Sequence, residues 1–337
     1  MSSVFDPAQR EEELRRESEQ WDTQNAVPAD HGDIPVVDVA AWFASGSPRD
    51  LDEVARCLGT ASETVGFHQL VGHGVDPALV DRAFDATRRF HALPLDRKAA
   101  IAMDRPEWPL GGVGYLRVGS RKLPRRALGN QNEAFVVKSD VGIDFDANQW
   151  PEAADAPGFR RAVERYAEAV SALAVRLLPA YAVALDLAPD HFGEAFRNPF
   201  WRLRLSHYPA RRAAPTDGEY GIAPHVDTTF FTLLRHDAPG LTVFCAPRNE
   251  WIIVPVVEDA FVVNAGELLR QWTNDRFLSA RHFADNRSPH SRYSIPFFFN
   301  ADADHVMEPL PSCVGPDNPP RYPPVSYRQS QASVQGE

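Results

Sequence analysis

The sequence predicts a mainly β fold with flanking helices. Apolar residues recur at helical spacing through much of the first half, whereas from Phe200 onward apolar and polar residues alternate with a period of two. Short apolar runs bounded by turn residues then continue as far as Phe299. These patterns indicate that the helices of the first half pack against a β-sandwich or barrel formed by the second half.

The same patterns divide the 337 residues into four segments. Residues 1–33 are expected to form a charged N-terminal extension and linker, with a surface helix over 7–21. The remaining segments are a helical and mixed region that packs on the core, the β core itself, and a C-terminal segment and tail, over 34–199, 200–300 and 301–337.

The order of elements follows from the spacing of apolar residues and from turn signals. Before residue 200 we expect strands over 34–39 and 66–71, and helices over 51–65, from Pro77 onward and over 159–187. Pro179 is expected to kink or split the last helix, because proline has no amide hydrogen to donate. Residues 106–155 predict ordered loops with short strands, and residues 316–324 an irregular, proline-rich tail. After the strand that begins near Phe200, further strands are expected over 230–234, 241–244, 251–256, 260–264 and 293–299.

Composition excludes several classes of function. The chain has 35 Lys and Arg against 46 Asp and Glu, a formal net charge of −11, which argues against a nucleic-acid partner. The three cysteines, Cys57, Cys245 and Cys313, offer neither a disulfide framework nor a paired zinc motif, so we expect a cytoplasmic protein. The charged N-terminus does not resemble a signal peptide, and no long uncharged apolar run predicts a membrane span.

A metal site is the strongest functional prediction. In His225-Val226-Asp227, at the expected end of a strand, alternation points the imidazole and the carboxylate the same way. A third candidate ligand, His282, follows His225 by 57 residues. Two imidazoles and one carboxylate on one face of a metal leave positions open for substrate and oxygen, an arrangement that suits non-haem Fe(II).

A carboxylate-binding pair follows the last of these residues. Arg292 and Ser294 lie two residues apart on an expected strand, so both point to the same side and can bind a carboxylate by an ion pair and a hydroxyl hydrogen bond. Each short pattern also occurs elsewhere in the chain. His31-Gly32-Asp33, for example, is a second His-x-Asp (HxD) triplet, which we interpret as a solvated turn. The joint order of the two motifs therefore carries the prediction.

The motifs occur together in a known family. The sequence Ile34-Pro-Val-Val-Asp38 resembles that family's opening strand, and the segment 66–75, GFHQLVGHGV, is similar to its "GFF…NHGV" signature. Residues 205–209, LSHYP, resemble the strand that ends in "YP", and residues 292–298, RYSIPFF, its distal "RxSxPFF". From about Ile34 to about Tyr327 the chain resembles the isopenicillin N synthase-like Fe(II)/2-oxoglutarate-dependent oxygenases.

This resemblance implies a fold, a site and a reaction. The fold would be a double-stranded β-helix, a cupin-like jelly roll with helices around it. The iron ligands would be His225, Asp227 and His282, while Arg292 and Ser294, assisted by Tyr208, would bind the distal carboxylate of 2-oxoglutarate. The enzyme would use Fe(II), 2-oxoglutarate and O2, with ascorbate as reductant in vitro. It would oxidise an unactivated C–H bond by hydroxylation, desaturation, cyclisation or epoxidation.

Three alternatives remain open at this stage. A minority of the family performs oxidative cyclisation without 2-oxoglutarate and uses the same arginine and serine to hold a substrate carboxylate. A cupin-like metal-binding protein without turnover would need no such pair. An interaction scaffold built on the helical first half would bind no Fe(II).

The chain also departs from the family pattern. Where the family commonly has Asn-Tyr-Tyr-Pro, this chain has Ser206-His207-Tyr208-Pro209, so a smaller hydroxyl replaces an inward amide and the cosubstrate is expected to pack more loosely. Arg281 precedes the distal histidine, and alternation turns it away from the metal.

The strand that ends at Tyr208 gives one prediction about the substrate. Alternation places Arg202, Arg204, Ser206 and Tyr208 on one face, so both arginines point inward if Tyr208 does. One arginine could instead pair with an acidic neighbour such as Glu133, or Arg202 could lie in water at the mouth of the barrel. Otherwise Arg204 meets an anionic group, and we expect a small, carboxylate-bearing substrate of specialised metabolism. Arg281 and Arg117 are weaker candidates at the rim.

Overall fold

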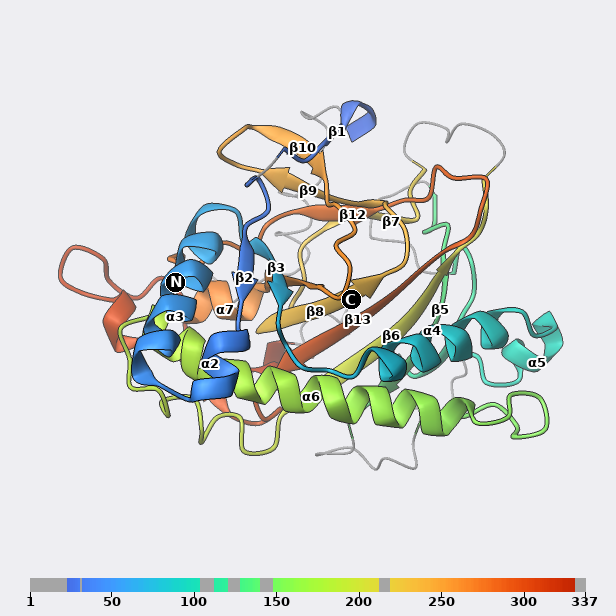
Figure 1. The fold of residues 1–337 in the computed structure, drawn as a ribbon, viewed down its shortest axis with the longest axis horizontal. Helices are drawn as coiled ribbons and strands as arrows, with labels where there is room; N and C mark the ends of the chain where they lie inside the picture. The colour runs from blue at the N-terminus through green and yellow to red at the C-terminus, as the bar shows by residue number, and fades with distance from the viewer. Residues whose placement is uncertain are drawn as a thin grey trace.

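Two β-sheets face each other, and helices cover the outer face of the larger one (Figure 1). The structure is a computed structural model that describes residues 23–30, 32–103, 112–120, 128–139, 148–211 and 219–330. The helix expected over 7–21 lies outside these residues.

The major sheet has eight strands in the order β2-β3-β11-β8-β13-β6-β5-β4. Their bounds are Val36–Asp38 (β2), Phe67–Val71 (β3), Phe261–Ala265 (β11), Phe231–His236 (β8), Arg292–Asn300 (β13), Phe200–Tyr208 (β6), Glu133–Lys138 (β5) and Gly114–Leu116 (β4). All neighbouring pairs are antiparallel except β2 with β3. The region over 34–199 therefore contributes strands to both edges of this sheet as well as the helices that cover it.

The minor sheet has five strands in the order β1-β10-β9-β12-β7. Their bounds are Val27–Pro28 (β1), Glu250–Ile253 (β10), Leu241–Cys245 (β9), His282–Ala284 (β12) and Ile222–His225 (β7). Strand β1 belongs to the N-terminal extension and pairs in parallel with β10, so this part of the extension is docked on the core. A small sheet of β14 (Val306–Met307) and β15 (Val325–Ser326) secures the C-terminal segment.

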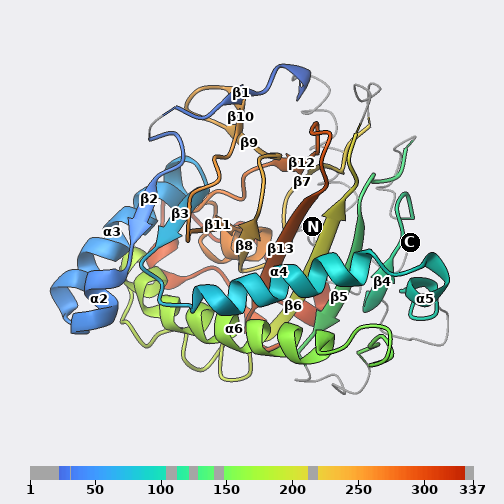
Figure 2. The same ribbon diagram turned by 45° about the vertical axis from the view of Figure 1, so that its right-hand side comes forward.

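The helices lie mainly on the outer face of the major sheet, where α4 and α6 run side by side (Figures 1 and 2). Their bounds are Ala40–Ser45 (α2), Pro48–Thr64 (α3), Pro77–His91 (α4), Leu95–Ala99 (α5), Phe159–Ala184 (α6) and Glu267–Trp272 (α7), with 3-10 turns over Thr23–Asn25 and Pro311–Cys313. Ser47 and Asp76 cap α3 and α4 by accepting a backbone hydrogen bond, and a proline follows each cap.

Helix α6 runs without interruption through Pro179, so the expected split is wrong. The carbonyl that Pro179 leaves without a helical donor belongs to Val175, whose exposed position allows water to hydrate it. By length and composition alone α6 could cross a membrane, although only half of its most apolar window is buried. In the structure it packs on α3 and α4, and its apolar stripe forms part of the main core, as in the central helix of a globular domain.

Most strands expected from the sequence are present with shifts of one or two residues, whereas the short helix α7 was not expected. The main hydrophobic core lies between the outer face of the major sheet and the helices. A second apolar cluster, which includes Phe67, Val243 and Ile252, lies between the two sheets. The space between the sheets beyond that cluster is occupied by polar and charged side chains.

Buried His68 gives a prediction about acid stability. Burial lowers the pKa of His68 from 6.5 to about 4, and its Nε2 atom has no partner within the part of the chain that the structure describes. The unfolded chain binds a proton at His68 near pH 6.5, whereas the folded chain binds it only near pH 4. The contribution of His68 to the free energy of unfolding is therefore complete above pH 6.5 and is lost as the pH falls toward 4. The loss amounts to about 2 kcal/mol at pH 5.

We therefore expect His68→Leu to flatten the loss of unfolding free energy between pH 7.5 and pH 5, as measured by urea denaturation. His290→Asn, at an exposed position, is the control and should keep the wild-type pH dependence. An unchanged slope in His68→Leu would mean that His68 does not contribute.

Candidate metal centre and carboxylate site

The two candidate histidine ligands lie opposite each other in the minor sheet. His225 ends β7, His282 begins β12, and the antiparallel register pairs them directly. Their ring centroids are 4.3 Å apart. Asp227 follows β7, and its Oδ1 atom lies 3.7 Å from Nε2 of His225 and 3.8 Å from Nε2 of His282. The structure thus brings together the three residues that the sequence predicted.

Backbone carbonyls orient both imidazoles. Nδ1 of His225 donates to the carbonyl of Ala223 at 2.9 Å, and Nδ1 of His282 donates to the carbonyl of Ala280 at 3.1 Å. A proton on Nδ1 leaves the lone pair on Nε2, the atom that faces Asp227. Metal-binding histidines in proteins commonly make this kind of outer hydrogen bond.

Two neutral donors hold the carboxylate of Asp227. Thr232 Oγ1 and Asn264 Nδ2 both donate to Oδ2, at 2.8 and 2.9 Å, so Oδ1 is left to face the histidines. Burial opposes ionisation of Asp227, but the imidazoles of His282 and His225 and these hydrogen bonds outweigh it and lower the pKa. The carboxylate is therefore ready to act as an anionic ligand.

This geometry fits a divalent metal ion. One ligand atom from each residue lies within 4.8 Å of the other two. Two neutral nitrogens and one anionic oxygen on one side of an ion are the donor set of non-haem Fe(II) sites, which keep their other positions open. Asp33 of the second HxD triplet instead pairs with Arg248 on the surface, while His31 lies outside the described residues.

Arg292 faces the same interior from the major sheet. Its side chain is 1% exposed, its Nε atom donates to the carbonyl of Ala238 at 3.0 Å, and its guanidinium lies over the ring of Tyr208, 4.6 Å from the centroid. Nη1 has no partner, and no carboxylate of a described residue forms an ion pair with Arg292. Because a buried unpaired charge is costly, this arrangement favours an anionic ligand.

The residues around Arg292 complete a narrow polar site. The register pairs Arg292 with Tyr208, and Ser294 with Ser206, so all four side chains share the inner face of β6 and β13. Ser206 is fully buried, and no described residue forms a hydrogen bond with its hydroxyl. A Cβ atom at Gly240 would lie 3.0 Å from the Arg292 side chain and 2.1 Å from the Asp285 carbonyl, so only glycine fits against the guanidinium here.

Arg204 also points inward and is buried. Its Nη2 atom donates to the side-chain oxygen of Asn132 at 2.8 Å when the Asn132 amide is oriented to donate to the Gly221 carbonyl. Its Nε atom has no partner among the described residues, and burial lowers the pKa of its guanidinium. The expected alternative of a pair with Glu133 is wrong, because Glu133 lies on the opposite face of β5 and binds Lys98 and His207.

Arg202 lies one step farther along the inner face. It is half-buried, donates to the Gly112 carbonyl at 3.5 Å and interacts with the Tyr327 hydroxyl, so it is not simply solvated at the mouth. Lys138 lies directly opposite it in the ladder, and burial together with Arg202 lowers the pKa of Lys138 to about 7. Arg204, Arg202 and Lys138 thus make this inner face strongly cationic.

The two rim candidates lie elsewhere. Arg281 stacks on Phe244, with 4.4 Å between its guanidinium and the ring centroid, on the side of the minor sheet away from His282, as alternation predicts. Arg117 is exposed. Sequence reasoning missed Thr232, Asn264 and Asn132. The first two lie at inward positions of their strands, so alternation could have placed them, but only their pairing across β8 and β11 brings them to Asp227.

Comparison with known proteins identifies the family. The family model described as the 2OG-Fe(II) oxygenase superfamily matches residues 201–301, and the model described as the N-terminal region of non-haem dioxygenases in morphine synthesis matches residues 34–153. The chain belongs to the 2OG-Fe(II) oxygenase superfamily. The family resemblance, the predicted enzyme class and the dependence on Fe(II) and 2-oxoglutarate that defines this superfamily are thereby confirmed.

Individual relatives cover nearly the whole oxygenase. It is 32% identical over 308 residues to the 2-oxoglutarate-Fe(II) type oxidoreductase hxnY of Emericella nidulans, covering 87% of this chain and 86% of the relative. The crystal structure of JOX2 in complex with 2OG, Fe and JA has a TM-score of 0.76 at 28% identity and covers 90% of this chain and 85% of its own. A full-length Neurospora crassa protein crystallised with alpha-KG has a TM-score of 0.81 at 24% identity, covers 92% and 98% of the two chains, and supports the fold alone. The predicted jelly-roll fold is confirmed.

The hydrogen bonds to Asp227 predict the effect of two conservative substitutions. Thr232→Val and Asn264→Leu each remove one donor to Oδ2, so the carboxylate is less well oriented, and we expect about tenfold weaker Fe(II) binding in each. Anaerobic Fe(II) titration measures this affinity. Thr242→Val, a buried threonine of β9 without contact to Asp227, is the matched control. Wild-type Fe(II) affinity in both variants would show that these donors do not orient the ligand.

Proposed function

We propose that the oxygenase binds Fe(II) through His225, Asp227 and His282, binds 2-oxoglutarate through Arg292, Ser294 and Tyr208, and oxidises a C–H bond of a small, carboxylate-bearing molecule of specialised metabolism. The observation that carries this proposal is that a three-ligand metal site shares one interior with a buried guanidinium that has no carboxylate partner among the described residues. A dicarboxylate cosubstrate can bridge the two, since one end can bind a metal while the other pairs with Arg292.

Each group has a defined task in this proposal. When bound, iron and 2-oxoglutarate supply the activation of O2 and the oxidising power. The protein orients the reactants: Thr232 and Asn264 fix Asp227, while Tyr208 and Gly240 confine the guanidinium of Arg292. The burial of Arg292 strengthens its interaction with a carboxylate, because charges attract more strongly in surroundings of low dielectric constant.

Arg204 supports an anionic substrate. Asn132 holds one end of its guanidinium, its Nε atom is free to donate, and Asp227 and Tyr208 both act on its charge. Its charge therefore interacts with one metal ligand and with one residue of the proposed carboxylate site. Arg202 and Lys138 add positive charge on the same face. Two solved neighbours were crystallised in complex with small molecules, one with thymine and one with JA.

The experiment that tests the reaction class is turnover without the unknown substrate. Wild-type protein is incubated with Fe(II), ascorbate, O2 and 2-oxoglutarate, and succinate is measured. Slow succinate release that depends on both Fe(II) and 2-oxoglutarate is expected. If no succinate is released and O2 is consumed only in the presence of a carboxylate substrate, the result would favour the cyclase that works without 2-oxoglutarate. If the protein does not bind Fe(II), the result would favour an interaction scaffold.

The two halves of the site give separable predictions. His225→Ala, Asp227→Ala and His282→Ala should each remove most Fe(II) affinity, because no other ligand replaces the lost one.

Arg292→Ala should leave Fe(II) binding intact but weaken 2-oxoglutarate binding by roughly 2–5 kcal/mol, measured from the charge-transfer absorption of the anaerobic complex. Unchanged affinities would contradict the respective assignments.

The role of Arg204 predicts a preference for acids over neutral analogues. Wild type should oxidise a carboxylic acid far better than its methyl ester or amide, and Arg204→Gln should lose most of this preference by raising the KM for the acid. The KM for 2-oxoglutarate should change little. If wild type treats acid and amide alike, the substrate is not recognised by its charge; if instead the KM for 2-oxoglutarate rises, Arg204 binds the cosubstrate.

A further inference from the structure

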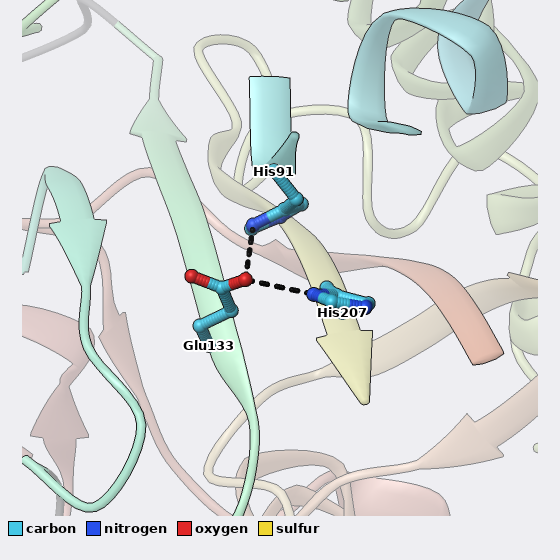
Figure 3. Close-up of side chains that lie close together, drawn as sticks. All are labelled: His91, Glu133 and His207. Carbon is cyan, nitrogen blue, oxygen red and sulfur yellow. Dashed lines mark hydrogen bonds and ion pairs between the residues drawn. The ribbon is translucent and has the colours of Figure 1, made fainter. Parts of the chain in front are cut away.

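A second cluster of titratable residues lies on the outer face of β5 and β6, around the carboxylate of Glu133 (Figure 3). His207 Nδ1 donates to Oε1 at 2.7 Å, and Nδ1 of His91 lies 3.4 Å from the same oxygen. The other oxygen, Oε2, accepts from Lys98 Nζ at 2.8 Å and from the Tyr115 hydroxyl. Four elements around β5 thus meet at one buried carboxylate.

Charge argues for a hydrogen-bonded network and against a second metal ion. Burial opposes ionisation of Glu133, but hydrogen bonds from His207 and Lys98 outweigh it and lower the pKa, while burial lowers the pKa of His91. The ion pair of Glu133 with Lys98 is therefore neutral overall. A divalent ion would add two uncompensated charges to a buried site.

The network holds β6 at the residues next to the proposed cosubstrate site. His91 Nε2 donates to the Leu205 carbonyl at 3.0 Å, and His207 lies between Ser206 and Tyr208. Since neighbouring residues of a strand point to opposite faces, His207 faces the network while Tyr208 faces the interior. A shift of His207 along the strand must therefore move Tyr208.

The second nitrogen of His207 reaches the partner strand. Nε2 of His207 lies 3.0 Å from the hydroxyl of Ser291, which donates to it because Nδ1 already carries the proton given to Glu133. Ser291 directly precedes Arg292, and Arg292 pairs with Tyr208 in the ladder. His207, the neighbour of Tyr208, is thus hydrogen-bonded to Ser291, the neighbour of Arg292.

We propose that His207, anchored by Glu133, is a positioning residue that fixes Tyr208 and Arg292 relative to each other and so sets the affinity for 2-oxoglutarate. This inference rests on the proposed role of Arg292. The metal ligands belong to β7, β12 and the turn after β7, and among the described residues no hydrogen bond joins these segments to Glu133, His91 or His207. Positioning by His207 is therefore expected to change cosubstrate affinity without changing metal affinity.

The experiment compares two variants by anaerobic titration with Fe(II) and then with 2-oxoglutarate. His207→Phe keeps a ring that can stack on Tyr293 but loses both hydrogen bonds, whereas Ser291→Ala removes the outer bond and leaves Glu133 with its donors. We expect the Kd for 2-oxoglutarate to rise about tenfold in His207→Phe and about threefold in Ser291→Ala. The Kd for Fe(II) should stay within about twofold of wild type in both.

Controls separate positioning from loss of stability. Val163→Ala creates a small cavity in α6 away from the network, lowers the melting temperature and should leave the Kd for 2-oxoglutarate unchanged. The double variant His207→Phe/Ser291→Ala should equal His207→Phe, because the bond between the two residues is already absent.

Three results would overturn the inference: unchanged 2-oxoglutarate affinity in both single variants, an equal loss of Fe(II) and 2-oxoglutarate affinity in His207→Phe, or a second bound metal equivalent that His207→Phe removes. Arg292→Ala distinguishes the two proposals. If Arg292→Ala leaves the Kd for 2-oxoglutarate unchanged, the proposed role of Arg292 is wrong. If Arg292→Ala raises this Kd but the His207 and Ser291 variants leave it unchanged, only the positioning role of His207 is wrong.

Discussion

The alternation of side chains along strand β6 links the inside of this oxygenase to its outside. Arg204, Ser206 and Tyr208 point between the two sheets, whereas Leu205 and His207 point toward the helices. Because the period of a strand is fixed, a shift in register by one residue would exchange these two sets. The polar interior and the apolar outer core therefore depend on the same register, which the ladders with β5 and β13 enforce.

Charge is distributed unevenly as a result. The chain carries a net charge of −11, yet the inner face of β5, β6 and β13 presents Lys138, Arg202, Arg204 and Arg292. Among the described residues neither Arg204 nor Arg292 has a carboxylate partner, so the folded protein retains a buried positive potential that anionic ligands can neutralise. In contrast, Glu133 on the outer face is fully engaged by Lys98, Tyr115 and His207.

The helices contribute to the site indirectly. The end of α4 supplies His91 and α5 supplies Lys98, whose Nζ also donates to the carbonyl of His91 at 2.9 Å. The two helices thereby hold β5 and β6 from behind while α6 covers the rest of the sheet. A reaction that needs reactants aligned to within a fraction of an ångström benefits from a rigid support of this kind.

The sequence by itself determined the fold class, most strands, and the grouping of His225, Asp227 and His282, because period-two alternation and motif order are local properties of the chain. The joint order of HxD, His and RxS also predicted that Arg292 binds a carboxylate. Only the tertiary structure decided that Arg204 meets Asn132 rather than Glu133, and that Thr232 and Asn264 hold Asp227. These contacts depend on register between strands far apart in sequence, and on the face of each strand that the helices cover, which no local pattern encodes.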